Sequence, residues 1–485
     1  ILQAGADGTA WNLDKVGDAI KEFSIRAIDG SDSTVEAFTS LGYNAENIMA
    51  TFAAGGEGAN KAFFDVINTL MAVDDQVERD ALGGTCLNRG CIPTKTLLHS
   101  ASLYRQVLHS AAFGVTASDA GFDYAVMDER RRQVVEQLRR GVEGLLKGNG
   151  VEVIHGSAVI EGPGRVRVGE AIYESEHILV AVGARPALPP IPGLDLPGVV
   201  TSDGLLGEGM YHPRLTIIGG GVIGMEFASL YSALGAQVTV LEAMDRVLPT
   251  MDKEIAQNLS MLMKRRGVKL CTGARVEQVM RTGEGLRCAY TSKEKAETVA
   301  ADAVLVSTGR TPNTEGLCGP GLDLGLDRGA IPVNERFETC VKGIYAIGDV
   351  VAGSIQLAHV ASAQAINAVS MIAGKEPPMK LNAIPACVYT EPEIASVGLT
   401  EAQAKEAGIP TKGSKYLMNG NGRSIIAGAE RGFIKVVSHA ETGTVLGAQL
   451  MCERATDLVG EFTLAVAEGK TLEELAALVR PHPTF

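Results

Sequence analysis

Residues 83–95 of the 485-residue chain read GGTCLNRGCIPTK, which separates Cys86 and Cys91 by four residues. If a helix begins at Cys91, the intervening turn can bring the two sulfurs within bonding distance. The positive end of that helix would lower a thiol pKa, and Pro93 suits a first turn because its missing N–H leaves no hydrogen bond unmade. The spacing alone also fits two unrelated thiols or half of a metal site, although no other close cysteine pair supplies the rest of a zinc site.

A second motif, LTIIGGGVIG at residues 215–224, follows an apolar strand pattern and opens a helix pattern. In a dinucleotide-binding unit Gly219 makes the turn, Gly221 lets the pyrophosphate approach the backbone, and Gly224 lets the helix pack on the strand. Glu242, at the end of the next predicted strand, would bind the ribose hydroxyls and repel the 2′-phosphate of NADP. The motif therefore favours NAD binding, and the alternative is a structural glycine turn in an α/β protein.

Two further strings are weak by themselves. Residues 343–349, GIYAIGD, predict a short strand that ends in Gly348 and Asp349, and a carboxylate there also suits an ordinary turn. The chain ends in HPTF, and a histidine such as His482 near a chain end is usually a solvated surface residue. Each string becomes informative only together with the other motifs.

Size and charge limit the classes of function. A chain with 46% apolar and 21% charged residues is typical of a globular protein, here of about three domains. The net charge of −13 argues against nucleic acid as a main partner, and no apolar run reaches the ~20 residues that span a bilayer. Eight cysteines with one close pair favour a cytoplasmic thiol protein over a secreted disulphide framework. The start at Ile1 suggests a fragment or a processed chain.

Hydrophobic periodicity predicts helices between residues 14 and 73 and no strand before about Val151. Further helices are predicted at residues 93–109, after a Gly/Cys loop, and at 124–147, 222–234 and 358–372. Strands are predicted at residues 151–154, 165–168, 177–182, 215–218, 237–241, 303–306 and 344–347. From residue 384 onward, strands and helices alternate without glycine-rich phosphate turns.

Three more strings complete a pattern: AVGARP at 181–186, STGRTPN at 307–313 and YTEPEIA at 389–395. Together with the motifs above, they resemble the class I pyridine nucleotide-disulphide oxidoreductases over residues 81–485. The dihydrolipoamide dehydrogenases are the most similar members, because CIPTK and Glu242 differ from the NADPH-dependent glutathione reductases. The HPT ending and the lack of a terminal cysteine pair differ from the mercuric reductases.

The resemblance implies an α/β fold of FAD- and NAD(P)-binding three-layer Rossmann-like domains with an α+β dimerisation domain. The implied FAD-binding domain comprises residues 81–187 and 311–383, the NAD-binding domain residues 188–310, and the interface domain residues 384–485. Residues 1–80 would be an extra helical segment that is foreign to the family.

The resemblance also implies roles for the dithiol and its neighbours. Cys86 would exchange with the substrate disulphide, and Cys91 would lie against the flavin. Lys95 would lie near flavin N5, paired with Glu226, while His482 would act across a dimer interface as the general base for Cys86. Electrons would pass from dihydrolipoamide to the dithiol, then to FAD and to NAD.

The family implies a set of cofactor contacts and partners but no metal. Beyond Lys95 and Glu226, the implied cofactor contacts are Gly183, Gly219, Gly221, Gly224, Glu242, Gly309, Asp349 and Ala358. The partners would be the lipoyl group of a 2-oxo acid dehydrogenase or glycine cleavage carrier protein, and a second copy of the chain in a cytoplasmic homodimer.

Two departures from the family pattern create alternatives. Residues 1–80 lack the strand, G-x-G-x-x-G turn and helix that bind the ADP half of FAD, since the GGEG string at 55–58 has no third glycine. Residues 18–73 instead resemble, weakly, a phage tail tape-measure protein. The family's glutamate five residues after the histidine would fall at position 487. The chain is thus interpreted as a working oxidoreductase, as a chimeric or misassembled product with impaired flavin binding, or as a phage protein that has captured an oxidoreductase body.

Overall fold

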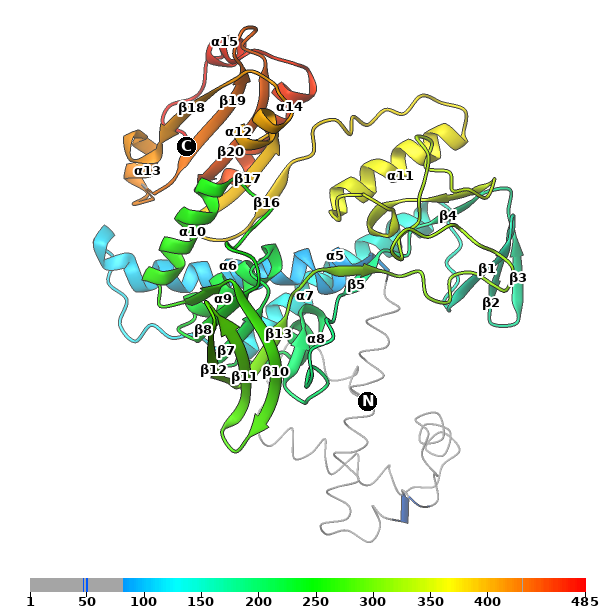
Figure 1. The fold of residues 1–485 in the computed structure, drawn as a ribbon, viewed down its shortest axis with the longest axis horizontal. Helices are drawn as coiled ribbons and strands as arrows, with labels where there is room; N and C mark the ends of the chain where they lie inside the picture. The colour runs from blue at the N-terminus through cyan, green and yellow to red at the C-terminus, as the bar shows by residue number, and fades with distance from the viewer. Residues whose placement is uncertain (1–46, 48, 51–81, 430) are drawn as a thin grey trace. The chain divides into compact units, whose positions relative to one another are not determined.

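The computed structural model describes residues 47, 49–50, 82–429 and 431–485 (Figure 1). The chain divides into two units between Ala81 and Leu82, and the fold presented here is that of the second unit. Segment 1–80, with the helices predicted between residues 14 and 73, lies outside the described residues. The exceptions are three helical positions at 47, 49 and 50.

The dithiol stretch is helical, and the loop predicted before residue 93 is wrong. Helix α5, Gly84–Arg89, contains Cys86, and α6, Cys91–His109, begins at the second cysteine. Gly90 separates the two helices, and a Cβ at this position would lie 2.8 Å from the carbonyl oxygen of Thr85. Because only glycine allows so close a backbone approach, two helices fit where the glycines of the stretch indicated a loop.

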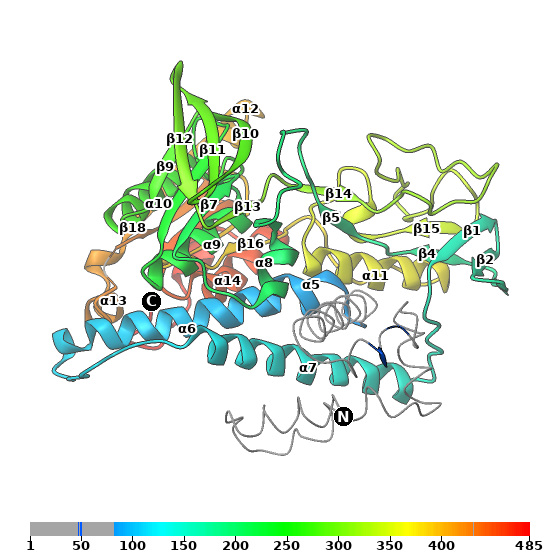
Figure 2. The same ribbon diagram turned by 90° about the horizontal axis from the view of Figure 1, so that it is seen from below.

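Helix α6 packs against two other helices of the unit, α7 and α9. Helix α7, Tyr124–Gly148, begins at an N-cap where Asp123 accepts hydrogen bonds from the backbone of Ala125 and Val126. Figure 2 shows α6 and α7 running side by side. The helices predicted at 93–109 and 124–147 are therefore confirmed.

The strands after α7 form small sheets. Strands β1 (Ala158–Gly162), β2 (Arg165–Val168) and β3 (Ala171–Glu174) are antiparallel, while β4 (Ile178–Val180) pairs in parallel with β15 (Ile344–Ala346). Strand β5 (Ala184–Pro186) pairs antiparallel with β14 (Arg310–Pro312). The strand predicted at 151–154 is wrong: this segment has no regular structure, its apolar side chains are exposed, and it pairs with no strand among the described residues.

The next region is a parallel sheet of order β6-β13-β7-β8-β9. Its strands are β6 (Val199–Thr201), β7 (Arg214–Ile218), β8 (Gln237–Glu242), β9 (Lys269–Thr272) and β13 (Ala303–Val306). Helix α9, Val222–Ala233, connects β7 to β8, and α8 (Ser202–Glu208) and α10 (Lys253–Arg265) follow β6 and β8. Strands β10 (Ala274–Thr282), β11 (Gly285–Ser292) and β12 (Lys295–Ala301) form a separate antiparallel sheet. The strand–turn–helix–strand prediction around Gly219 is confirmed.

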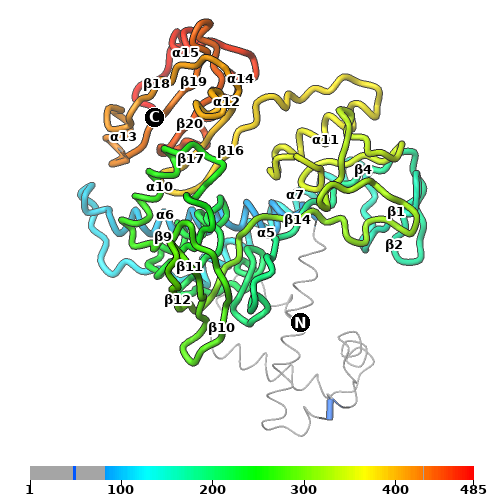
Figure 3. Tube along the Cα trace, viewed as in Figure 1, coloured from blue at the N-terminus to red at the C-terminus, as the bar shows by residue number. Residues whose placement is uncertain are grey.

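Helix α11, Ala358–Ile372, matches its predicted bounds and is followed by a long connection without helix or strand that leads to β16 (Figure 3). The C-terminal region is an antiparallel sheet of order β16-β17-β20-β19-β18, against which α14, Ala455–Ala467, packs. Its strands are β16 (Ala386–Val388), β17 (Glu393–Gly398), β18 (Thr411–Leu417), β19 (Phe433–His439) and β20 (Val445–Cys452). The short helices are α12 (Glu401–Glu406), α13 (Gly422–Ile426) and α15 (Leu472–Ala476). Among the described residues, no helix is long and apolar enough to cross a membrane.

Candidate active site

The two cysteines lie at the junction of α5 and α6, and both are free thiols. Cys91 is the first residue of the 19-residue helix α6, so the positive end of the helix dipole favours a thiolate there. Thr94 fixes the first turn by donating from its hydroxyl to the carbonyl of Gly90 at 2.7 Å. The sequence spacing predicted this arrangement of a helix that begins at the second cysteine.

The pair shares one proton unequally. The hydrogen bond from Cys86, aided by the charge of Lys95, lowers the pKa of Cys91 from 9.0 to about 6. The same hydrogen bond, together with burial, raises the pKa of Cys86 far above its ordinary value. These opposite pKa shifts favour the thiolate on Cys91 and the proton on Cys86.

A buried carboxylate joins three elements beside the dithiol. Glu226 on α9 is 3% exposed, and its Oε2 accepts a hydrogen bond from Lys95 Nζ of α6 at 2.6 Å. Its Oε1 accepts from the backbone N–H of Tyr389 at 2.9 Å, just after β16. The Lys95 ammonium also lies 4.8 Å from the centre of the Tyr389 ring. The predicted Lys95–Glu226 pair is thus present, and the role of Tyr389 was missed because a backbone donor leaves no mark on the sequence.

The glycine turn has the geometry that a dinucleotide site needs. Gly219 has φ +108°, and a Cβ on it would lie 2.4 Å from the Ser307 carbonyl oxygen. A Cβ on Gly224 would lie 2.0 Å from the carbonyl oxygen of Gly219, so helix α9 packs directly on the turn. A Cβ on Gly221, the N-cap of α9, would meet nothing within 4 Å. This opening at a helix N-terminus leaves room for a phosphate, so the residues fit the pyrophosphate of NAD.

Glu242 lies at the carboxyl end of β8 and is 8% exposed. Its Oε2 accepts from the N–H of Gly220 at 2.5 Å, and its Oε1 accepts from the N–H of Met244 at 2.7 Å. The carboxylate therefore shapes the glycine turn as well as offering lone pairs to a ligand. A cavity of about 470 Å³ lies at the same end of the sheet and is lined in part by Asp245, Arg246 and Thr272.

Of the predicted flavin contacts, Asp349 lies near the end of β15, and the structure only partly brings these contacts together. Asp349 lies in a short 3-10 helix, Gly348–Val350, and burial raises the pKa of its carboxyl although Arg310 lies 3.8 Å away. The Arg310 Nε is buried and has no hydrogen-bond partner in the described part of the chain. Gln364 of α11 accepts from the N–H of Gly348 at 2.7 Å. An acid that is raised in pKa beside an orphaned guanidinium nitrogen fits a polar ligand such as the flavin side chain.

The remaining predicted residues lie in separate places. Gly183 and Gly309 have φ of +67° and +118° and flank the paired strands β5 and β14. Ala358 is the exposed first residue of α11. His482 is exposed, and among the described residues its ring has no hydrogen-bond partner, Cys86 included. Among the described residues, no group of three or more His, Cys, Asp or Glu could hold a metal.

Sequence profiles match most of the chain. The profile described as pyridine nucleotide-disulphide oxidoreductase matches residues 58–365, and the profile of the dimerisation domain of these enzymes matches residues 384–485. The first match begins at residue 58, within the range 51–81 that lies outside the described residues.

Individual relatives agree with the profiles. The chain is 38% identical over 417 residues to a dihydrolipoyl dehydrogenase of Chlamydia pneumoniae, and the match covers 84% of this chain and 88% of the relative. It is 37% identical over 427 residues to a dihydrolipoyl dehydrogenase of Bacillus subtilis, with coverage of 84% and 90%.

Two solved structures have the same fold as this chain. LpdA from Mycobacterium tuberculosis superposes with a TM-score of 0.76 at 28% identity, covering 84% of this chain and 89% of that one. The HOCl-induced flavoprotein disulphide reductase RclA from Escherichia coli gives a TM-score of 0.74 at 30% identity, with coverage of 83% and 89%.

Proposed function

The chain belongs to the pyridine nucleotide-disulphide oxidoreductases, a family that uses FAD and NAD, and from that premise we propose that it oxidises the dihydrolipoyl group of a carrier protein with NAD as acceptor. Its class is that of a FAD-dependent, NAD-linked disulphide oxidoreductase. The named activity of the relatives from Chlamydia pneumoniae and Bacillus subtilis supports the choice of substrate.

The geometry of the dithiol carries the proposal, because Cys91 begins helix α6 and Cys86 lies on α5 directly before it. In thiol–disulphide exchange, the sulfur of lower pKa is the better leaving group. A substrate thiolate therefore attacks Cys86 of the oxidised pair, the Cys86–Cys91 bond breaks, and Cys91 leaves as the thiolate that Lys95 stabilises. The second substrate thiolate then displaces Cys86, which forms the substrate disulphide and leaves both protein cysteines reduced.

The protons need a base that can reach Cys86. We assign this role to His482 from a second copy of the chain, which follows the match to a dimerisation domain. The proposal therefore includes a homodimer. It also places the protein in the cytoplasm, where free thiols such as the eight cysteines of this sequence persist.

The cofactors have separate residues to hold them. Gly219, Gly221 and Gly224 would cradle the pyrophosphate of NAD, and Glu242 would bind its ribose. Lys95, Gly183, Gly309, Asp349 and Ala358 would contact FAD. FAD held by these residues would supply the redox chemistry that relays the electron pair of the dithiol to NAD, which would accept it as hydride.

The test is turnover of dihydrolipoamide by the purified protein, reconstituted with FAD, with NAD or NADP as acceptor. We expect NAD reduction to be strongly preferred, and Cys86→Ser and Cys91→Ser each to reduce turnover roughly a hundredfold or more. The matched control is Cys340→Ser, which changes an exposed thiol outside the pair and should leave the rate unchanged. Equal use of NADP, or full turnover by either variant of the pair, would show that the assignment is wrong.

A further inference from the structure

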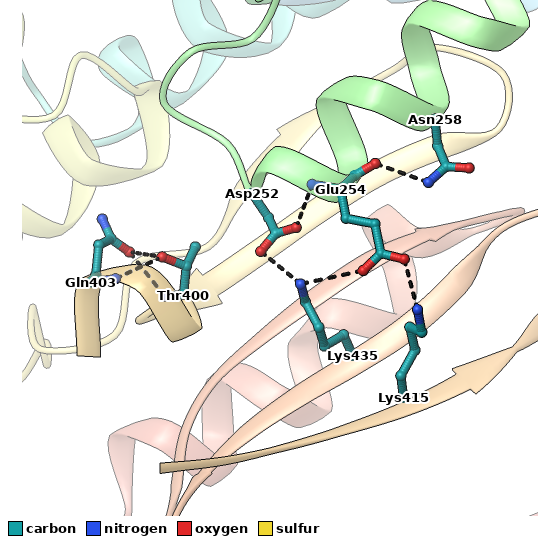
Figure 4. A network of polar contacts seen from close by, with 7 residues as sticks. All are labelled: Asp252, Glu254, Asn258, Thr400, Gln403, Lys415 and Lys435. Atoms are coloured by element: carbon teal, nitrogen blue, oxygen red, sulfur yellow. Dashed lines mark hydrogen bonds and ion pairs between the residues drawn. The ribbon is translucent and has the colours of Figure 1, made fainter. Parts of the chain in front are cut away.

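A buried ion pair joins the NAD-binding sheet region to the C-terminal sheet (Figure 4). Lys435 on β19 donates from Nζ to Asp252 Oδ2 at 2.8 Å and lies 3.6 Å from Glu254 Oε2. The side chains of Lys435 and Asp252 are both 9% exposed. Because removal of one partner would leave an uncompensated buried charge, the contact holds its two elements firmly together.

The acid of this pair ends the loop that follows Glu242. Asp252 is the N-cap of α10 and accepts from the N–H of Glu254 at 2.9 Å, so residues 243–252 are fixed at their far end. The residue before it is held by the same sheet, because Ser396 of β17 contacts the sulfur of Met251 at 3.4 Å. Strands β17 and β19 of the C-terminal sheet thus both contact the end of the loop 243–252.

The other face of this loop, residues 243–252, contacts the glycine turn. The N–H of Leu248 donates to the carbonyl of Gly220 at 2.8 Å, and Glu242 accepts from the N–H of Gly220. Leu248 is fully buried and has φ +46°, a left-handed conformation that costs a non-glycine residue free energy. Such a conformation persists only where its surroundings hold it, and the anchor at Asp252 is part of what holds it.

We infer that Lys435 is a positioning residue for NAD, acting through residues 243–252. By anchoring Asp252, it keeps Leu248 on Gly220 and so keeps the backbone open at Gly221, where the pyrophosphate is proposed to bind. The inference rests on the proposed function, because it takes NAD to be the ligand of this glycine turn. It makes the affinity for a cofactor in one region depend on a charge in another.

The neighbouring lysine supplies a matched control. Lys415 on β18 donates to Glu254 Oε1 at 2.7 Å, but its side chain is 40% exposed and does not contact Asp252. Lys415→Met therefore removes a lysine of the same network (Figure 4) without releasing the end of the loop.

The experiment measures NAD binding by titration calorimetry and amide hydrogen exchange of the full chain. We expect Lys435→Met to raise the Kd for NAD roughly tenfold and to speed exchange of the Leu248 amide, while Lys415→Met changes neither. Since Lys435→Met leaves Asp252 unpaired and can unfold the chain, the double variant Asp252→Asn/Lys435→Met removes both charges and keeps a capping side chain. It should restore thermal stability and still bind NAD weakly.

Two results are informative against the idea. A folded Lys435→Met or double variant whose Leu248 amide and NAD affinity match the wild type overturns the inference. An affinity that recovers in step with thermal stability in the double variant also overturns it, because Lys435 would then have only a structural role. A wild-type chain that binds no NAD contradicts the proposed function instead. In that case, the rate of Leu248 amide exchange still decides whether Lys435 controls the loop.

Discussion

The regions proposed to bind NAD and flavin, the NAD side and the flavin side, differ in how much of each lies in one continuous stretch. The five parallel strands and the glycine turn of the NAD side all fall between residues 199 and 306. On the flavin side, the parallel strands within the described residues are β4 and β15, which come from segments far apart in the chain. A site contained in one stretch can be recognised whole, whereas a divided site is recognised only in pieces.

Flavin retention is the largest expected difference between the two sides. Residues 1–80 lack a G-x-G-x-x-G turn in their sequence, so we expect the purified chain to hold far less than one FAD per subunit while it still binds NAD. Replacing residues 1–80 by the corresponding segment of the Bacillus subtilis relative should raise flavin absorbance roughly tenfold or more and leave the Kd for NAD unchanged. If the purified wild-type chain is yellow and holds one FAD per subunit, this prediction is wrong and the two sides do not differ in cofactor retention.

The pKa of Cys91 tests whether the dithiol on the flavin side has its lowered thiol pKa in the absence of flavin. In the reduced protein, we expect the Cys91 thiolate to persist as the pH falls from 9 and to be protonated only below about pH 6. Cys86→Ala removes the hydrogen bond that is the largest cause of the lowered pKa, so the midpoint should move to higher pH. The measurement is the pH dependence of Cys91 alkylation followed by peptide mapping, and a midpoint at the ordinary thiol value in the unchanged protein would refute it.

Two glycines of the NAD side should separate folding from binding. Gly224→Ala places a Cβ 2.0 Å from a carbonyl oxygen and should destabilise the chain by about 2–3 kcal/mol. Gly221→Ala meets nothing within 4 Å, so we expect stability within about 0.5 kcal/mol of the wild type and a Kd for NAD about tenfold higher. Chemical denaturation and calorimetry give the two quantities, and equal destabilisation by both variants would disprove the distinction.

The contact between the two sides gives the smallest and most specific effect. The charge of Lys95 lowers the pKa of Cys91, and the charge of Glu226 raises it. Lys95→Met and Glu226→Gln should therefore move the Cys91 midpoint in opposite directions, each by less than Cys86→Ala does. Shifts of the same sign would indicate that both variants act by disturbing α6 rather than through their charges.

Much of the NAD side could be predicted from the sequence, because its signals are local. Strand β7, helix α9 and strand β8 were predicted within one residue at each end, since apolar periodicity and glycine positions specify a strand–turn–helix unit. The same local logic located α6, α7 and α11. Local sequence also sufficed for the dithiol, because helix start and cysteine spacing coincide at Cys91.

Contacts between distant segments could not be predicted in this way. The stretch 151–154 is apolar enough for a strand but pairs with no strand in the part of the chain that the structure describes, and pairing is a property of the whole sheet. The bond from the Tyr389 backbone to Glu226 involves a donor that every residue except proline has, so no residue type announces it. The ion pair between Lys435 and Asp252 likewise joins positions 183 residues apart, so local sequence does not predict it.

The short ribbon of β5 and β14 has a consequence for how such proteins can change over evolution. It pairs Ala184–Pro186 with Arg310–Pro312, and the N–H of Ala187 donates to the carbonyl of Gly309 at 2.9 Å. Residues 188–308 therefore form a segment that leaves and rejoins the rest of the chain at neighbouring points, as an insertion into a host domain would. An insertion with adjacent ends adds little chain entropy to its host, so a recombination event could exchange it as one cassette. Coenzyme preference could then be replaced in a single genetic step while the thiol chemistry of the host is inherited unchanged.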